Sequence, residues 1–154
     1  MMRKYGIEGS SYAVVTGGSN GFGLEFCHQL AAQGFNICMI SRNKEKIDQK
    51  LAEIKAEYPV EVLGVQADLS KMTTMAAYHE LIKEQFPDID IGILCLNAGV
   101  MLPQVPYDLT RDEDVEATFH INGLHVVYLM KALVKRLLQR ERRSGVIIVS
   151  SGLA

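Results

Sequence analysis

The glycine-rich stretch from Thr16 to Gly23 has the residue types and spacing of an anion-binding turn. An apolar run before it predicts a buried parallel strand, and helical periodicity begins directly after it. Glycine lets a ligand approach the backbone, and the first amides of a helix attract phosphate. An ordinary strand-to-helix connection is the alternative. The predicted phosphate-binding residues are Thr16, Gly17, Ser19, Asn20, Gly21, Phe22 and Gly23.

Candidate ligand-binding residues, most of them polar or small, also follow each of the other four strands that the apolar pattern predicts. They are Ser41 and Arg42 after the second strand, Asp68 and Leu69 after the third, Asn97, Ala98 and Gly99 after the fourth, and Ser151 after the fifth. The carboxyl ends of parallel strands meet at one edge of a sheet, where open α/β folds bind their ligands. We therefore expect these residues to surround one crevice.

The end of the second strand indicates which dinucleotide this crevice binds. An NAD site favours a carboxylate there, which accepts hydrogen bonds from the ribose 2′-hydroxyl. The chain has Ser41 and Arg42 instead, and a guanidinium can hold a 2′-phosphate through two hydrogen bonds. We predict NADP(H) as the cofactor. A surface arginine that only precedes a helix is the alternative interpretation of Arg42.

Strands and helices alternate along the whole chain. The periodicity predicts strands over 12–15, 36–41, 60–67, 89–96 and 146–149, and helices over 22–33, 44–58, 73–86 and from about 112 or 114 to 140. This alternation is typical of a Rossmann-like, three-layer, doubly wound α/β fold with the parallel strand order 3-2-1-4-5. No linker or repeat interrupts it, so we expect one dinucleotide-binding domain over 1–154.

Composition and charge exclude several other classes of protein. The net charge of −2 gives no general attraction to nucleic acid. Three cysteines lie in apolar segments, without the spacing of a metal site, and predict free thiols in an intracellular, reducing compartment. The start of the chain lacks the apolar run of a signal peptide. The longest apolar stretch, 89–102, contains Asp90 and Asn97, so no transmembrane segment is expected.

Four motifs together resemble the short-chain dehydrogenase/reductase family. The spacing Thr16-Gly17-x-x-x-Gly21-x-Gly23 matches its cofactor turn, and Leu96-Asn97-Ala98-Gly99 matches its Asn-Asn-Ala-Gly motif with one asparagine replaced. Asn122 and Ser151 match its helix asparagine and its catalytic serine. Within the family, the chain is most similar to the branch of 17β-hydroxysteroid dehydrogenases and very-long-chain 3-oxoacyl-CoA reductases. The segments that carry this finer resemblance are 4–6, 40–43 and 91–94.

The resemblance implies a role for each matching residue. It implies that Asp68 holds the adenine amino group, that Asn97, Ala98 and Gly99 line the cofactor, that Ser151 polarises a substrate carbonyl and that Asn122 anchors a water in a proton relay. Lipophilic carbonyl or hydroxyl compounds, of the steroid or 3-oxoacyl type, are the implied substrates. Purely structural roles stay open: a turn for Asp68, a backbone tie for Asn97, a core polar group for Asn122 and a strand-end hydroxyl for Ser151.

The family's proton donor, a tyrosine in a Tyr-x-x-x-Lys motif, has no match in this sequence. None of its tyrosines has a lysine four residues later. We therefore expect a C-terminally truncated member of the family that has negligible activity by itself and uses a small lipophilic substrate only if completed. The alternative is a catalytically inactive nucleotide-binding or structural subunit of a larger assembly.

Two segments are predicted to contact a partner, either in a homo-oligomer or from another protein. The helix 114–140 is apolar almost all round, which predicts burial on two sides. The strand 146–149 is apolar and uncharged and would form an open edge of the sheet. A group of basic residues in the second half of the helix is expected to be solvated. These residues are Lys131, Lys135, Arg136, Arg140, Arg142 and Arg143.

Overall fold

The computed structural model of the chain describes residues 1–86 and 88–151. Its centre is a five-stranded parallel sheet in the order β3-β2-β1-β4-β5, as the alternation of elements predicts. The strands are β1 (Ser11–Thr16), β2 (Asn36–Ser41), β3 (Val62–Gln66), β4 (Asp90–Leu96) and β5 (Gly145–Ile148). The predicted fold class and strand order are therefore confirmed.

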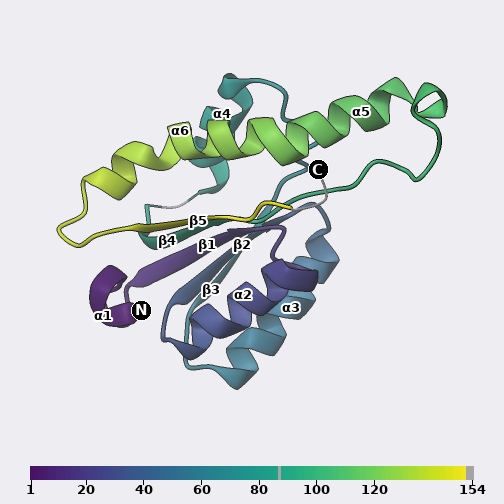
Figure 1. The fold of residues 1–154 in the computed structure, drawn as a ribbon. Helices are drawn as coiled ribbons and strands as arrows, with labels where there is room; N and C mark the ends of the chain where they lie inside the picture. The colour runs from purple at the N-terminus through teal and green to yellow at the C-terminus, as the bar shows by residue number, and fades with distance from the viewer. Residues whose placement is uncertain (87, 152–154) are drawn as a thin grey trace.

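Helices cover both faces of this sheet. Figure 1 shows α2 (Gly21–Ala32) and α3 (Lys44–Glu57) on one face, and α4 (Met75–Gln85) and α6 (His125–Leu138) on the other. The short α1 (Met2–Tyr5) was not predicted, nor was the single turn of 3₁₀ helix η1 (Tyr107–Leu109) within the loop after β4. The strands are apolar on both sides because a helical layer covers each side.

Local capping signals explain where two of the helices begin and end. Asparagine is a residue type that favours the position before a helix, and the Asn43 side chain accepts a hydrogen bond from the amide of Lys46 at 2.9 Å and so caps α3. Gly34 follows α2 with a φ of +86°, the left-handed conformation in which glycine commonly ends a helix. The sequence also predicts that Pro87 ends the helix before β4, because proline cannot continue a helix, and this residue lies outside the described residues.

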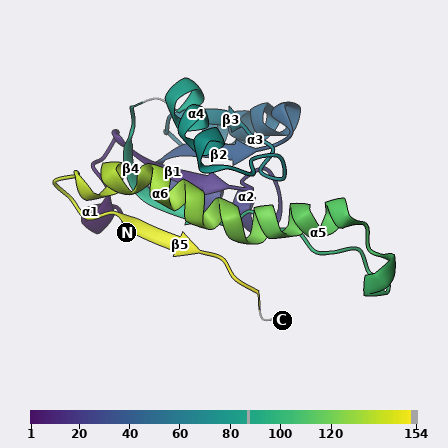
Figure 2. The same cartoon turned by 90° about the horizontal axis from the view of Figure 1, so that it is seen from above.

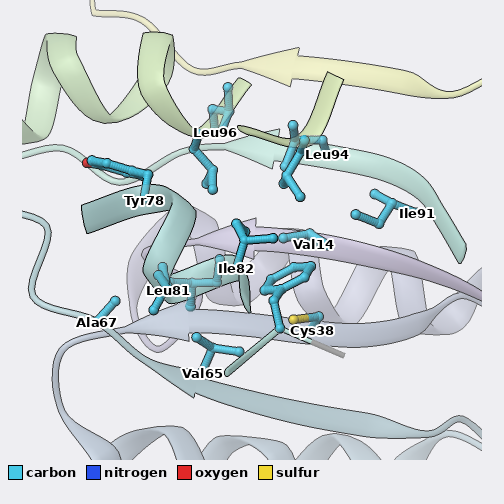
Figure 3. Packing of buried hydrophobic residues seen from close by; sticks show 14 of the residues in the cluster. Val14, Cys38, Val65, Ala67, Tyr78, Leu81, Ile82, Ile91, Leu94 and Leu96 are labelled. Carbon is cyan, nitrogen blue, oxygen red and sulfur yellow. The ribbon is translucent and has the colours of Figure 1, made fainter. Parts of the chain in front are cut away.

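Two apolar cores lie on opposite faces of the sheet. Figure 3 shows one of them, in which Tyr78 and Ile82 of α4 pack beside Val14, Leu94 and their neighbours on the strands. The other core lies between the sheet and the helices α2 and α3. The three cysteines are buried and free, and burial raises the pKa of the Cys27 and Cys95 thiols to about 12. These thiols are therefore not reactive near neutral pH.

The long helix after β4 is interrupted by a π turn. It consists of α5 (Asp112–Phe119), the five-residue π segment η2 (His120–Leu124) and α6. One stripe of α6 is buried against the sheet, while Val127 and Leu138 are 61% and 78% exposed. The outer side of this helix is therefore exposed in the chain alone, and its predicted contact with a partner stays a prediction.

Arg140 corrects the prediction of a solvated basic face. Its side chain is only 6% exposed and forms an ion pair with Asp90 at the start of β4. It also donates to the carbonyl of Tyr5 at 2.9 Å and to that of Arg143 at 2.8 Å. Arg142 donates to the carbonyl of Arg3. The group is thus not uniformly solvated, because Arg140 ties the end of the long helix to the amino ends of the strands.

β5 is the outer strand of the sheet next to β4, as Figure 2 shows from above. Among the described strands, β5 pairs with β4 alone, so its other edge is unpaired, as the sequence predicts. Two of its apolar side chains, Val146 and Ile148, are 42% and 56% exposed. Among the described residues, none of the helices is long and apolar enough to cross a membrane.

Candidate functional site

A crevice of about 490 Å³ lies at the carboxyl ends of the strands. All the predicted cofactor residues line it except Thr16 and Gly23. The residues that line it without having been predicted are Ile40, Asn43, Lys46, Ala67, Val100, Ile121 and Val149. The structure therefore brings the ends of all five strands together at one site, which is the arrangement that the strand-end residues predict.

The turn after β1 has a conformation that requires its glycines. Gly17 and Gly21 have φ values of +67° and +52°, which residues with a side chain rarely adopt. At Gly23, an added Cβ would lie 2.2 Å from the carbonyl oxygen of Gly17 and 2.5 Å from the amide nitrogen of the Asn97 side chain. The spacing of the three glycines therefore lets the helix start pack tightly under the turn. The Asn20 side chain makes no capping hydrogen bond to the first amides of α2.

Thr16 lies beneath the crevice and joins two of its walls. Its hydroxyl accepts hydrogen bonds from the amides of Asn97 at 2.9 Å and Ala98 at 3.0 Å, and it is fully buried. The Asn97 side chain donates in return to the carbonyl of Thr16 at 3.0 Å. Asn97 therefore ties neighbouring backbone together, as its structural interpretation predicts, while it also lines the crevice. Thr16 and Gly23 do not line the crevice, but both contact residues that do.

Two basic side chains border the crevice at the end of β2. Within the described part of the chain, neither the Arg42 guanidinium nor the Lys46 ammonium has a hydrogen-bond or ion-pair partner. Arg42 is exposed, and its backbone carbonyl accepts from Gln66. The sequence-based prediction did not include Lys46. Its position four residues after Arg42 would have indicated it, because residues four apart lie on the same side of a helix and α3 begins between them. Ser41 bonds to Ser19 across the crevice floor, hydroxyl to hydroxyl, at 2.7 Å.

Asp68 and Leu69 line the crevice from the end of β3. One carboxylate oxygen of Asp68 accepts from the amide and the hydroxyl of Ser70, at 3.2 Å and 2.6 Å. The other lies 3.8 Å from the ammonium of Lys71. The turn that the structural interpretation of Asp68 predicts is therefore present. The same carboxylate stands at the crevice, where a ligand's amino group can approach it.

Neither of the two predicted catalytic residues is among those that line the crevice. Asn122 lies in the π segment, and its side chain both accepts from the amide of Val100 at 2.9 Å and donates to its carbonyl at 2.8 Å. It is exposed, so its interpretation as a core polar group is wrong. Ser151 is exposed, two residues after Val149, which lines the crevice. π segments inside α-helices frequently occur at functional sites.

His125 is a buried residue near the site that sequence analysis did not select. Its Nε2 lies 3.3 Å from the Thr16 hydroxyl, and its Nδ1 contacts the carbonyl of Ile121. Burial lowers the pKa of this imidazole, so it is neutral near neutral pH. In the sequence, the only signal for His125 is its position on the apolar stripe of the helix, and that position by itself predicts a residue packed in the core.

The strand order and the crevice at the carboxyl ends of the strands define a doubly wound, Rossmann-like α/β protein. The family model of the short chain dehydrogenases matches residues 11–154, and the chain belongs to that family. It is 33% identical to the 17-beta-hydroxysteroid dehydrogenase type 3 of Danio rerio over 93% of this chain and 46% of that protein. It is also 33% identical to a very-long-chain 3-oxoacyl-CoA reductase of Aspergillus terreus, over 92% of this chain and 40% of that protein. The chain thus spans less than half the length of these relatives.

Solved structures of similar proteins agree with this assignment. A short-chain dehydrogenase from Sphingobium yanoikuyae in complex with NADPH is 27% identical, with a TM-score of 0.79 over 92% of this chain and 54% of that one. A structure of a 7beta-hydroxysteroid dehydrogenase has a TM-score of 0.81 at 26% identity, over 97% of this chain and 54% of that one. These comparisons support a nicotinamide dinucleotide as the ligand of the crevice. They give no support to the alternative of a subunit that lacks catalysis.

Proposed function

We propose that this chain is the NADP(H)-binding part of an oxidoreductase that acts on lipophilic carbonyl or hydroxyl compounds. The observation that carries the proposal is the pair of cations, Arg42 and Lys46, which have no partner among the described residues and lie beside the glycine-rich turn. At the same place, the strand end carries Ser41 rather than a carboxylate. A 2′-phosphate fits two cations, whereas the 2′-hydroxyl of NAD favours an acceptor.

The rest of the crevice provides groups for the remainder of a dinucleotide. The turn between Gly17 and Gly21 presents backbone to a pyrophosphate at the start of α2. The carboxylate of Asp68 can accept from an adenine amino group, and Leu69 supplies apolar surface beside it. Asn97 and Ala98 lie directly beside the turn, and with Gly99 they line the crevice where they can contact the ribose and the nicotinamide.

The bound nicotinamide would supply or accept the hydride of the reaction. The Ser151 hydroxyl is the proposed donor to the carbonyl oxygen, on which negative charge develops. Asn122 is the proposed anchor of a water in a proton relay, and its side-chain bonds to Val100 fix its position beside the crevice. No tyrosine of the sequence has a lysine four residues later. An absent acid typically costs a factor of roughly 10² to 10⁴, so we expect negligible turnover by this polypeptide alone.

The substrate class is proposed from the relatives. Their names include steroid dehydrogenases and 3-oxoacyl-CoA reductases, whose substrates carry a carbonyl or hydroxyl group on a large apolar body. The exposed apolar side chains of Val100 and Met101 follow the crevice wall formed by β4 and suit such a body.

Calorimetric titration of the chain with NADP⁺ and with NAD⁺ tests the proposal. We expect tighter binding of NADP⁺, and we expect Arg42→Ala to weaken NADP⁺ by roughly 10- to 100-fold, the effect of one lost charge-assisted contact. NAD⁺ affinity should change less than threefold. Lys44→Ala is the matched control, because Lys44 lies on the same helix start but pairs with Asp48 and does not line the crevice. Equal affinities for the two nucleotides would overturn the assignment of Arg42.

A further inference from the structure

The hydrogen bonds of the Thr16 hydroxyl determine the direction of its bond to His125. A hydroxyl has one hydrogen to donate and two lone pairs to accept with. Both lone pairs of Thr16 are used by the amides of Asn97 and Ala98, at 2.9 Å and 3.0 Å. Its hydrogen therefore goes to the remaining neighbour, the Nε2 of His125 at 3.3 Å. This nitrogen must be an acceptor without a proton.

The other nitrogen of the ring gives the same answer independently. The Nδ1 of His125 contacts the carbonyl oxygen of Ile121, which can only accept, so Nδ1 must carry the proton. A neutral imidazole has one donor and one acceptor, and both contacts are satisfied by the Nδ1-protonated tautomer alone. The His125 side chain is fully buried, and the lowered pKa of the ring agrees with the neutral form.

The π turn makes this arrangement possible. The backbone amide of His125 donates to the carbonyl of His120, five residues earlier. In a regular α-helix that amide would bond to the carbonyl of Ile121, four residues earlier. The π segment therefore releases the Ile121 carbonyl from that amide and lets it accept from the imidazole instead. The same segment carries Asn122 toward Val100 at the rim of the crevice.

We propose that His125 is a positioning residue for the dinucleotide site, which directs the Thr16 hydroxyl so that both its lone pairs hold the turn after β4. The chain of contacts runs from Ile121 through His125 and Thr16 to the amides of Asn97 and Ala98. It links the long helix, β1 and β4 beneath the crevice. His125 does not touch the crevice, so it acts through Thr16. The inference rests on the proposed function for its effect on NADP⁺, but not for its effect on the two turns.

Two amide substitutions separate this role from packing. A glutamine places its carbonyl oxygen near the position of Nε2 and can still accept from Thr16. An asparagine is one methylene shorter, keeps a donor near the position of Nδ1 and cannot reach Thr16. Leu129→Ala is the control for a cavity, because Leu129 is fully buried one turn further along the same stripe.

The first measurements need no ligand. Nitrogen-15 spectra of the histidine-labelled protein should show the Nδ1-protonated tautomer for His125. Amide exchange at Asn97 and Ala98 should quicken at least tenfold in His125→Asn, beyond any change in global stability, and less than threefold in His125→Gln. An Nε2-protonated ring would overturn the proposal, as would equal exchange in the two variants, or exchange in Leu129→Ala that matches His125→Asn.

NADP⁺ affinity, measured by calorimetry, should fall roughly five- to tenfold in His125→Asn and stay within twofold in His125→Gln. Equal losses in the two variants would overturn the positioning role. If the unmodified chain does not bind NADP⁺ at all, the proposed function fails, and the tautomer and exchange measurements still decide between a positioning and a packing role for His125.

Discussion

Two arginines at opposite ends of the same sheet have opposite surroundings. Arg42 stands exposed at the carboxyl ends of the strands, and its guanidinium has no partner among the described residues. Arg140 lies at the amino ends, 6% exposed, and bonds to Asp90 and to two backbone carbonyls. A buried charge must be paired, whereas a solvated one need not be. The difference separates a charge that the fold uses from one that is available to a ligand.

The pair of Arg140 and Asp90 organises the amino end as a network. Asp90 accepts from Ser11 at the start of β1 as well as from Arg140. Ser11 accepts in turn from the amide of Ile7 at 2.7 Å. The network thus joins the end of the long helix, two strand starts and the N-terminal segment. Its members thus satisfy one another's hydrogen-bonding groups.

The largest effect should come from breaking this network. We expect Arg140→Met to lower the free energy of unfolding by about 3–5 kcal/mol, because it leaves the Asp90 charge without its partner. Urea denaturation followed by circular dichroism measures this. Arg142→Met is the control, since Arg142 is exposed and donates only to the carbonyl of Arg3, and it should cost about 0.5 kcal/mol or less. Equal losses in the two variants would contradict the distinction.

At the other end, a smaller loss of stability should accompany a loss of binding. Gly23→Ala places a Cβ 2.2 Å from the carbonyl oxygen of Gly17, so the turn must move. We expect a cost of about 1–3 kcal/mol and NADP⁺ binding too weak to titrate. Gly123→Ala is the control, because its Cβ would meet nothing within 4 Å. Unchanged NADP⁺ affinity in Gly23→Ala would show that the ligand does not depend on this turn.

Acid should weaken the amino end by a smaller amount than Arg140→Met does. The hydrogen bond from Arg140 holds the pKa of Asp90 below its ordinary value. The stability contributed by this shift is fully present above the unfolded pKa of about 3.9, and it is lost as the pH falls through the folded pKa. The urea midpoint should therefore fall more steeply below about pH 4 in the unmodified protein than in Asp90→Asn. Parallel pH profiles would exclude this contribution.

The sequence was sufficient to predict the sheet and most of the crevice because both depend on local signals. Apolar runs such as Ala13–Val15 and the order of the elements determine the parallel sheet. Small and polar residues at strand ends then have to meet at one edge, whatever the details of packing. For this reason the sequence alone predicts that Ser41, Arg42 and Asp68 lie at the crevice, and all three line it.

The remaining features depend on contacts between residues far apart in the sequence. Arg140 near a helix end resembles its solvated neighbours until Asp90 is brought beside it by the fold. The π turn depends on one displaced backbone hydrogen bond, from the amide of His125 to the carbonyl of His120, and no residue type in the sequence predicts such a displacement. His125 acquires its partner only when the helix packs against Thr16 of β1, more than a hundred positions earlier. Periodicity describes neighbours along the chain and carries no information on such pairs.

The smallest expected effect completes the comparison of the two arginines. Arg42→Ala should change the free energy of unfolding by less than about 0.5 kcal/mol in the absence of nucleotide, because Arg42 is exposed and its guanidinium contacts none of the other described side chains. Thermal unfolding without nucleotide measures this. When both chains are measured with NADP⁺, the variant should have the lower melting temperature, because it binds the nucleotide less tightly. A loss above about 1 kcal/mol without nucleotide would assign Arg42 to the fold. If both measurements give these results, the position of Arg42 beside the glycine-rich turn is explained by a ligand rather than by the fold.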